Sequence, residues 1–547
     1  MRSIKSVVTK RKALTSLLSA AFVISLGFAT TADAVTPPTV SLPTYTFAQQ
    51  EGNFLTFPGN TVPLTPAWAK AYYNAIDPLG NKLTFTQWMV EAGFIGQESD
   101  WHSTGAQIIK TTLDNAGVQP NPTGNHPQDD NVIYADSHMI AINNADLGFV
   151  RNQFVRCKPS CNAKNPIIYT YLENYPYDAL KTEPFGFPNQ AEVDAAITGA
   201  IANRTSRIAD VAFVWGPPPD GSSPTSRYGQ IYAYVFHQAN PADPATISET
   251  RNWFTDPTAI AGLNARTACT PFPGGCPPLF PIVGGTGGDP STGDPFSPEL
   301  DALGFKQNPA VCFMCHGGNP RGLTSTGQYP SQGRSSGFKF LPLDNDNLLF
   351  PSSGPLTRTS QELQIKRYNQ AVLMTQGAAP VATSNLNGLW KIPKFTDAQG
   401  VTRTSHAVEV ILGWYGGTVA NPVMPNATQN SQFIPVGWRE AAHGGTAPAG
   451  SEDLYVKAVG PSCRACHSQR ESDIDFGTVG SFDANKGDIL ELVLGPACDS
   501  YSPPPGKVVM PAAKRTFDRF WLHDQDQYIA THFGFASTTD YCAKAGQ

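Results

Sequence analysis

The sequence predicts a multidomain protein of mixed class, with a mostly β N-terminal domain followed by two mainly α domains. A chain of 547 residues is longer than a single hydrophobic core usually supports. The 49 glycines and 48 prolines favour many turns and short elements over long helices. A stretch rich in glycine and proline at 270–298 separates a region of strand-like alternation from one of helical spacing. These observations place the three domains at 35–269, 299–449 and 450–547.

The N-terminus has the three-part layout of a secretory signal peptide. An apolar run at 13–29 is followed by the small-residue pattern Ala32-Asp33-Ala34, which is typical of a cleavage site. Five basic residues precede the run: Arg2, Lys5, Lys10, Arg11 and Lys12. The run is short and is broken by Ser and Gly, which disfavours the alternative of a membrane anchor. We therefore expect the signal peptide, residues 1–34, to be removed and the mature protein to be periplasmic or extracellular.

The charge of the mature chain limits its partners. The full chain has a formal net charge of −6, and loss of five basic residues and Asp33 with the signal peptide moves this charge to −10. An acidic surface disfavours nucleic acid and anionic membranes, and it allows docking to a basic protein. No other stretch approaches the length of a membrane-spanning helix. We expect no nucleic-acid partner and no stable membrane insertion after signal cleavage.

Residues 35–269 are predicted to form the mostly β domain, with some helix. The segments VAFVW (211–215) and GQIYAYVFH (229–237) alternate as strands do, whereas TFTQWMVEAGF (84–94) has the apolar spacing of a helix. The linker at 270–298 ends this domain. Nothing in the domain names a ligand, and its role as a binding or docking module is an open alternative.

The ten cysteines divide into two groups by their spacing. Six fall into plausible disulfide pairs for an exported protein: Cys157 with Cys161, Cys269 with Cys276, and Cys498 with Cys542. The other four lie in two Cys-x-x-Cys-His stretches, CFMCH at 312–316 and CRACH at 463–467. A disulfide needs no histidine, so these four cysteines indicate a different use.

Cys-x-x-Cys-His is the attachment pattern of a c-type haem. Two thiols at this spacing reach the two vinyl groups of one porphyrin as thioethers, and the following histidine binds the iron. Two covalently bound haems are therefore expected. The residues of the two sites are Cys312, Cys315 and His316 for the first haem, and Cys463, Cys466 and His467 for the second. A four-sulfur zinc site or a redox dithiol would explain neither histidine, and no βαβ pattern surrounds either motif.

The second segment, residues 450–547, resembles class I cytochrome c. A helical pattern in SEDLYVKAVG precedes its motif, Met510-Pro511 follows 43 residues after His467, and a helical pattern at 512–533 comes last. The apolar face of that last pattern consists of Phe517, Phe520, Trp521, Tyr528 and Ile529. The resemblance implies that Met510 is the sixth ligand of the second iron, opposite His467. A soft thioether in this position stabilises ferrous iron.

The first segment, residues 299–449, departs from that family. Its matching methionine, Met424, lies 108 residues after His316, and the helical pattern at 406–417 comes before it rather than after. Met424 is the predicted sixth ligand of the first iron. The alternatives are His406, His443 and an open position. A helix at 357–376 is expected to pack over this haem. Both segments are predicted to be mainly α, cytochrome c-like haem domains.

Two functions fit these expectations. The favoured one is an exported dihaem c-type cytochrome that exchanges single electrons with unidentified redox proteins while both axial ligands stay bound. The alternative is an enzyme that resembles bacterial dihaem cytochrome c peroxidases or dihaem rubber oxygenases, with a reactive first haem at His316 and a second haem that relays electrons. The sequence shows no distal motif of those families, and no catalytic residue is assigned.

Overall fold

The computed structural model describes a large part of the chain. The described residues are 55, 66–82, 84–101, 108–111, 132–146, 148–161, 166–175, 190–202, 209–216, 230–238, 249–250, 311–318, 321–330, 338–381, 386–396, 402–468, 474–498 and 509–545. The predicted signal peptide, the predicted linker and the predicted pair Cys269–Cys276 lie outside these residues.

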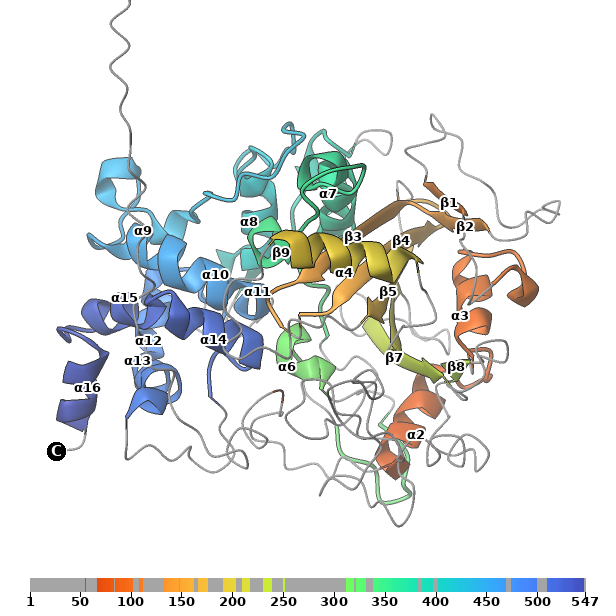
Figure 1. Ribbon diagram of the computed structural model, residues 1–547, viewed down its shortest axis with the longest axis horizontal. Coiled ribbons are helices and arrows are strands. Elements are labelled where there is room, and N and C mark those ends of the chain that lie inside the picture. The colour runs from red at the N-terminus through yellow and green to blue at the C-terminus, as the bar shows by residue number, and fades with distance from the viewer. Residues whose placement is uncertain are drawn as a thin grey trace, which may run out of the picture. The chain divides into compact units, whose positions relative to one another are not determined.

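One antiparallel sheet dominates the N-terminal region (Figure 1). Its strand order is β8-β7-β6-β5-β4-β3-β9. The five long strands are β3 (Ser137–Asn143), β4 (Val150–Lys158), β5 (Ile167–Tyr175), β6 (Ala209–Gly216) and β7 (Gln230–Gln238). The strands predicted at 211–215 and 229–237 are confirmed as β6 and β7. A separate parallel pair consists of β1 (Ile108–Thr111) and β2 (Val132–Ala135).

The two edge strands of the sheet come from different parts of the chain. The strand β8 (Glu249–Thr250) pairs with β7, whereas β9 (Leu348–Leu349) pairs with Ile142 and Asn143 of β3. The residues of β9 follow the first Cys-x-x-Cys-His motif by more than thirty positions. The first predicted haem segment therefore contributes a strand to the N-terminal sheet.

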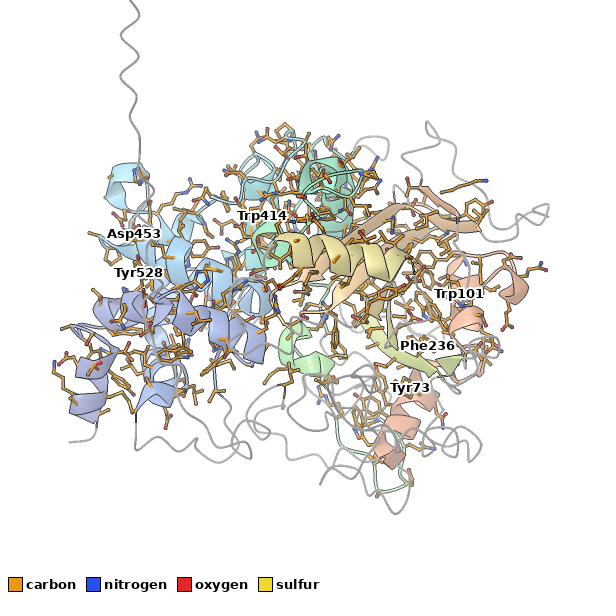
Figure 2. The ribbon with its side chains drawn as sticks, in the orientation of Figure 1. Tyr73, Trp101, Phe236, Trp414, Asp453 and Tyr528 are labelled. Carbon is orange, nitrogen blue, oxygen red and sulfur yellow. A yellow bond between two sulfur atoms is a disulfide. The ribbon has the colours of Figure 1, made fainter. Side chains whose placement is uncertain are left out.

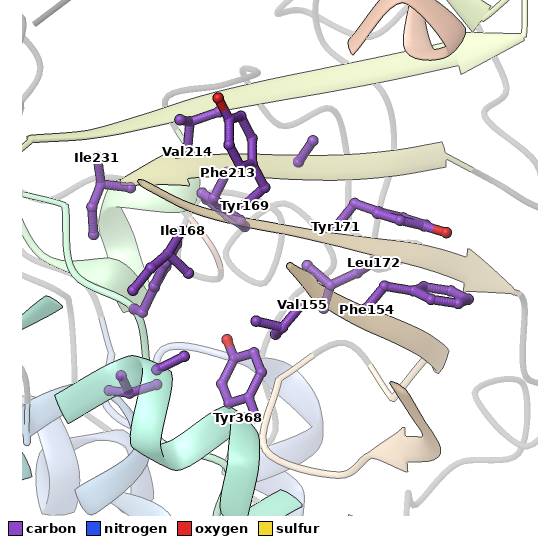
Figure 3. Close-up of a cluster of buried hydrophobic side chains, with 14 of the residues drawn as sticks. Phe154, Val155, Ile168, Tyr169, Tyr171, Leu172, Phe213, Val214, Ile231 and Tyr368 are labelled. Carbon is purple, nitrogen blue, oxygen red and sulfur yellow. The ribbon is translucent and has the colours of Figure 1, made fainter. Parts of the chain in front are cut away.

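The two faces of the sheet pack against different helices, because side chains alternate between the faces along each strand. On one face, the ring of Tyr171 lies 5.3 Å from that of Phe85 in α3 (Phe85–Ala92). On the other face, Val155 and Ile168 point toward Tyr368 of α7 (Arg358–Thr375), as Figure 3 shows. The sheet thus lies between the N-terminal helices, which pack on one face, and the first predicted haem segment, which packs on the other.

The helix predicted at 84–94 is confirmed as α3. It begins after Thr84, whose hydroxyl accepts a hydrogen bond from the backbone of Gln87, and it ends at Gly93, whose φ of 79° suits a residue without a side chain. Two further helices of this region are α2 (Pro66–Ile76) and α4 (Gln190–Ala202). Short 3₁₀ turns occur at Glu98–Asp100, Asn345–Asn347, Val436–Trp438, Ala441–His443 and Gly495–Ala497.

The first predicted haem segment contains three helices among its described residues: α6 (Cys312–His316), α7 and α8 (His406–Trp414). The predicted helices at 357–376 and 406–417 are confirmed as α7 and α8. Two small antiparallel pairs lie between them: β10 (Ala379–Pro380) with β11 (Trp390–Lys391), and β12 (Phe395–Thr396) with β13 (Thr402–Arg403).

The regular elements of the second predicted haem segment are all helical among its described residues. Its elements are α9 (Ser451–Leu454), a π-helical turn (Tyr455–Val459), α10 (Gly460–Ser462), α11 (Arg464–His467), α12 (Val479–Ala484), α13 (Lys486–Ile489), a second π-helical turn (Leu490–Leu494), α14 (Lys514–Leu522), α15 (Gln525–His532) and α16 (Thr538–Ala545). The pattern at 512–533 forms two helices because Asp524 adopts a left-handed φ of 53° between them.

The described hydrophobic cores do not coincide with the three predicted domains. One cluster joins Phe154 and Phe213 of the sheet to Phe313, Val372 and Met424 of the first haem segment. A second cluster lies within the last part of the chain, from Trp438 to Ala530. The sheet and the first segment therefore share one core.

Of the helices among the described residues, none combines the length and apolar character that a membrane crossing requires.

Candidate haem sites

The motif cysteines are distinguished from the others by their bonding. The disulfides Cys157–Cys161 and Cys498–Cys542 form as predicted. Cys312, Cys315, Cys463 and Cys466 take part in neither and carry thiols. In the part of the chain that the structure describes, no cluster of three metal-binding side chains includes any of these four. The motif cysteines are thus two pairs of thiols, one pair in each motif.

Each motif forms a short helical turn, which brings its three functional side chains to one side. The helix α6 spans the whole of Cys312–His316, and α11 begins directly after Cys463. Residues three and four positions apart lie next to each other on a helix. The two cysteines and the histidine of each motif consequently share a face, as attachment to a single porphyrin requires.

The two motif histidines make the same hydrogen bond. The Nδ1 atom of His316 donates to the carbonyl oxygen of Lys339 at 2.7 Å, and that of His467 donates to the carbonyl oxygen of Ile474 at 2.6 Å. A carbonyl only accepts, so Nδ1 carries the proton and Nε2 carries the lone pair. This bond is the usual way in which proteins fix the tautomer and orientation of a metal-binding histidine. In both histidines Nε2 is therefore the ring nitrogen that could bind a metal.

Aromatic rings lie against the two histidines, which are partly buried. The ring of Phe476 stacks on that of His467, with centroids 4.2 Å apart and planes 9° apart. The ring of His316 lies 5.0 Å from Phe213 and 6.1 Å from Phe338. Burial raises the pKa of the Cys312 and Cys463 thiols to about 12. Both motifs thus have apolar surroundings, which suit a macrocycle with a hydrophobic body.

The two predicted methionine ligands lie in different surroundings. Met510 is partly buried against the second core, together with Cys463 of the motif. Met424 is 0 % exposed within the core that the first segment shares with the sheet. Its carbonyl oxygen accepts a hydrogen bond of 2.7 Å from Nζ of Lys366, a buried lysine whose pKa burial lowers to about 8. Met510 therefore keeps accessible surface, whereas protein atoms enclose the Met424 side chain on all sides.

The two alternative histidines also differ from each other. His406 is buried, its Nδ1 donates to the carbonyl oxygen of Asp475 at 2.9 Å, and its Nε2 has no hydrogen-bond partner among the described residues. Burial lowers the pKa of His406, which keeps its imidazole neutral. His443 is exposed and bonds to Glu452 at 2.6 Å. His443 is thus already paired, whereas His406 and Met424 are both enclosed by protein atoms, so burial does not distinguish these two candidates.

The structure brings the two motifs together. The helices α6 and α11 are in contact, although more than 140 residues separate them in the sequence. Arg464 lies between the two cysteines of the second motif and forms a buried ion pair with Asp344 of the first segment, with N–O distances of 2.5 Å and 2.9 Å. Its guanidinium also lies over the ring of Trp414. Trp414 is the last residue of α8 and is labelled in Figure 2.

The surroundings of Arg464 favour the protonated, charged form of its guanidinium. Burial on its own lowers the pKa of a guanidinium, but the carboxylate of Asp344 outweighs this effect and the pKa of Arg464 rises above its usual range. Sequence reasoning missed Asp344 and Trp414 as contacts of the second motif. The one available signal was the arginine inside CRACH, since a charged residue at a buried helical turn requires a partner.

Comparison of the chain with models of known protein families, with curated proteins and with solved structures gives no match.

Proposed function

We propose that this protein is an exported dihaem c-type cytochrome that transfers single electrons. The observation that carries the proposal is the repeated arrangement of two thiols outside any disulfide beside a histidine whose Nδ1 donates to a backbone carbonyl. A covalently bound haem would supply an iron that changes its charge by one electron. The two motifs would hold two such groups next to each other, because α6 and α11 are in contact.

The residues of each site have separate tasks in this function. The cysteines fix the macrocycle, the carbonyls of Lys339 and Ile474 orient the histidines, and the aromatic rings exclude water. Fixed ligands and apolar surroundings would keep structural change small when an electron arrives or leaves. The acidic mature chain would dock to a basic redox protein outside the cytoplasm.

The axial ligands follow from the same reasoning. For the second iron we propose His467 and Met510, since both lie at the core that contacts Cys463. For the first iron we propose His316, with Met424 as the methionine of that segment. Met424 would have to move its enclosed side chain to reach an iron. This enclosure favours a second candidate function, in which the first iron keeps an open position and the protein is a dihaem peroxidase or oxygenase.

The two functions are separated by low-temperature EPR of the oxidised protein with and without cyanide. We expect Met510→Ala to convert the low-spin signal of the second haem into a high-spin, cyanide-sensitive signal, because the iron loses its thioether ligand. The electron-carrier function requires that Met424→Ala do the same to the first haem. A cyanide-sensitive signal that is already present in the wild type and unchanged by Met424→Ala would favour the second function instead.

A further inference from the structure

The face of the N-terminal sheet that meets the first haem segment also touches the histidine of that segment. Phe213 lies on β6, about one hundred residues before the motif, and its ring centroid is 5.0 Å from that of His316 with a plane angle of 33°. Both Phe213 and its neighbours across the sheet are buried. The contact connects a region without any haem motif to the predicted iron ligand.

Phe213 also contacts the segment that accepts the hydrogen bond of His316. Its ring lies 6.0 Å from that of Phe340, at an angle of 80°. Phe340 follows Lys339, whose carbonyl oxygen accepts the hydrogen bond from Nδ1 of His316. Phe338, on the other side of Lys339, contacts the His316 ring at 6.1 Å. The His316 ring is therefore held by one hydrogen bond and by contacts with the rings of Phe338 and Phe213, of which Phe213 is the one from the sheet.

Hydrogen bonds also join the sheet to the first segment at several points besides Phe213. The hydroxyl of Ser137 donates to the carbonyl oxygen of Gln364 in α7 at 2.7 Å. The side chain of Gln361 both accepts from the backbone of Ile140 at 2.7 Å and donates to it at 2.9 Å. The strand β9 adds backbone pairing to β3. These bonds fix the position of the sheet relative to α7 and β9 of the first segment, whose His316 lies beside Phe213.

We propose that the N-terminal sheet is a structural part of the first haem site, and that Phe213 is a positioning residue that sets the orientation of the His316 ring. This inference rests on the proposed function, since it assigns a role toward the first haem. The plane of an axial imidazole relative to the macrocycle affects the electronic state of the iron, and residues around a ligand tune the reduction potential. The sheet then contributes a residue to the first haem site and is not a separate docking module.

The test compares two substitutions in the full-length protein. Phe213→Leu removes the ring beside His316, whereas Phe236→Leu removes an equally buried ring from β7 that faces α3, where it contacts Phe85 at 5.5 Å. We expect Phe213→Leu to shift the EPR g-values and the midpoint potential of the first haem only. Phe236→Leu should reduce thermal stability and leave both haem signals in place. The first haem is identified as the signal that survives loss of Cys463 and Cys466.

Three results would overturn the inference. Unchanged signals in Phe213→Leu would make Phe213 an ordinary core residue, and equal shifts in both variants, or shifts in both haems, would indicate general loosening. If Phe213→Leu does not fold, Phe213→Met keeps most of the volume without the ring, and the same shift of the first haem is expected. Absence of covalent haem from the wild type would refute the proposed function itself, whereas haem signals that do not respond to Phe213 would refute this inference alone.

Discussion

Replacing both Cys463 and Cys466 with serine is expected to remove one of the two covalent haems from the exported protein. Thioether bonds require the thiols, and serine cannot form them. The haem absorbance per polypeptide should fall to roughly half, because the first motif is untouched. Haem-stained denaturing gels and the absorbance of the reduced protein provide the measurement. The signals that remain belong to His316 and its surroundings.

A matched control removes two other cysteines from the same segment. Cys498 and Cys542 form a disulfide 44 residues apart in the chain, and neither belongs to a Cys-x-x-Cys-His motif. Their replacement by serine should lower stability, since a disulfide restricts the unfolded chain, while haem content stays the same. Equal loss of haem in both double variants would mean that haem content reports folding rather than attachment, and would remove this support for the second site.

The substitution Arg464→Met is expected to reduce the free energy of unfolding by about 3–5 kcal/mol, because it leaves the buried carboxylate of Asp344 without its partner. The two groups are each about 4 % exposed and meet at 2.5 Å. Chemical denaturation followed by circular dichroism measures the change. The exposed pair of Lys457 with Asp453, at 3.5 Å, is the control, and Lys457→Met should change stability far less.

A second substitution tests the cause of this loss. In the Arg464→Met background, Asp344→Asn removes the unpaired charge but keeps an acceptor for the backbone N–H of Asp346. The double variant should therefore be more stable than Arg464→Met alone. If the double variant loses additional stability, the ion pair is not what joins the two segments, and packing on Trp414 would account for the effect of Arg464.

Local patterns in the sequence predicted local structure well. The alternation of β6 and β7, the apolar spacing of α3, α7 and α8, and the spacing of two disulfide pairs all correspond to what the structure shows. In each case the determinants lie within a short stretch of chain, where side-chain periodicity or the reach of a cysteine decides the outcome.

Long-range contacts were not predictable from the same patterns. Pairing of Leu348 and Leu349 with β3 depends on strand register, and the contact of Phe213 with His316 depends on which face of the sheet meets α6. Neither property is encoded in a local motif. The break at Asp524 also escaped prediction, because helical spacing on both sides of it continues in the sequence while the backbone turns. The thiol pairs and histidines were found from spacing, but their acceptors, Lys339 and Ile474, were not.

The most direct test of the central claim is the intact mass of the exported protein after denaturation. Two haems joined by thioethers stay attached under denaturing conditions, so we predict the mass of the chain from Val35 plus the mass of two haems. Replacement of the motif cysteines should remove one haem mass for each motif. A mass equal to that of the polypeptide alone would contradict the dihaem assignment, and with it the proposed electron-transfer function.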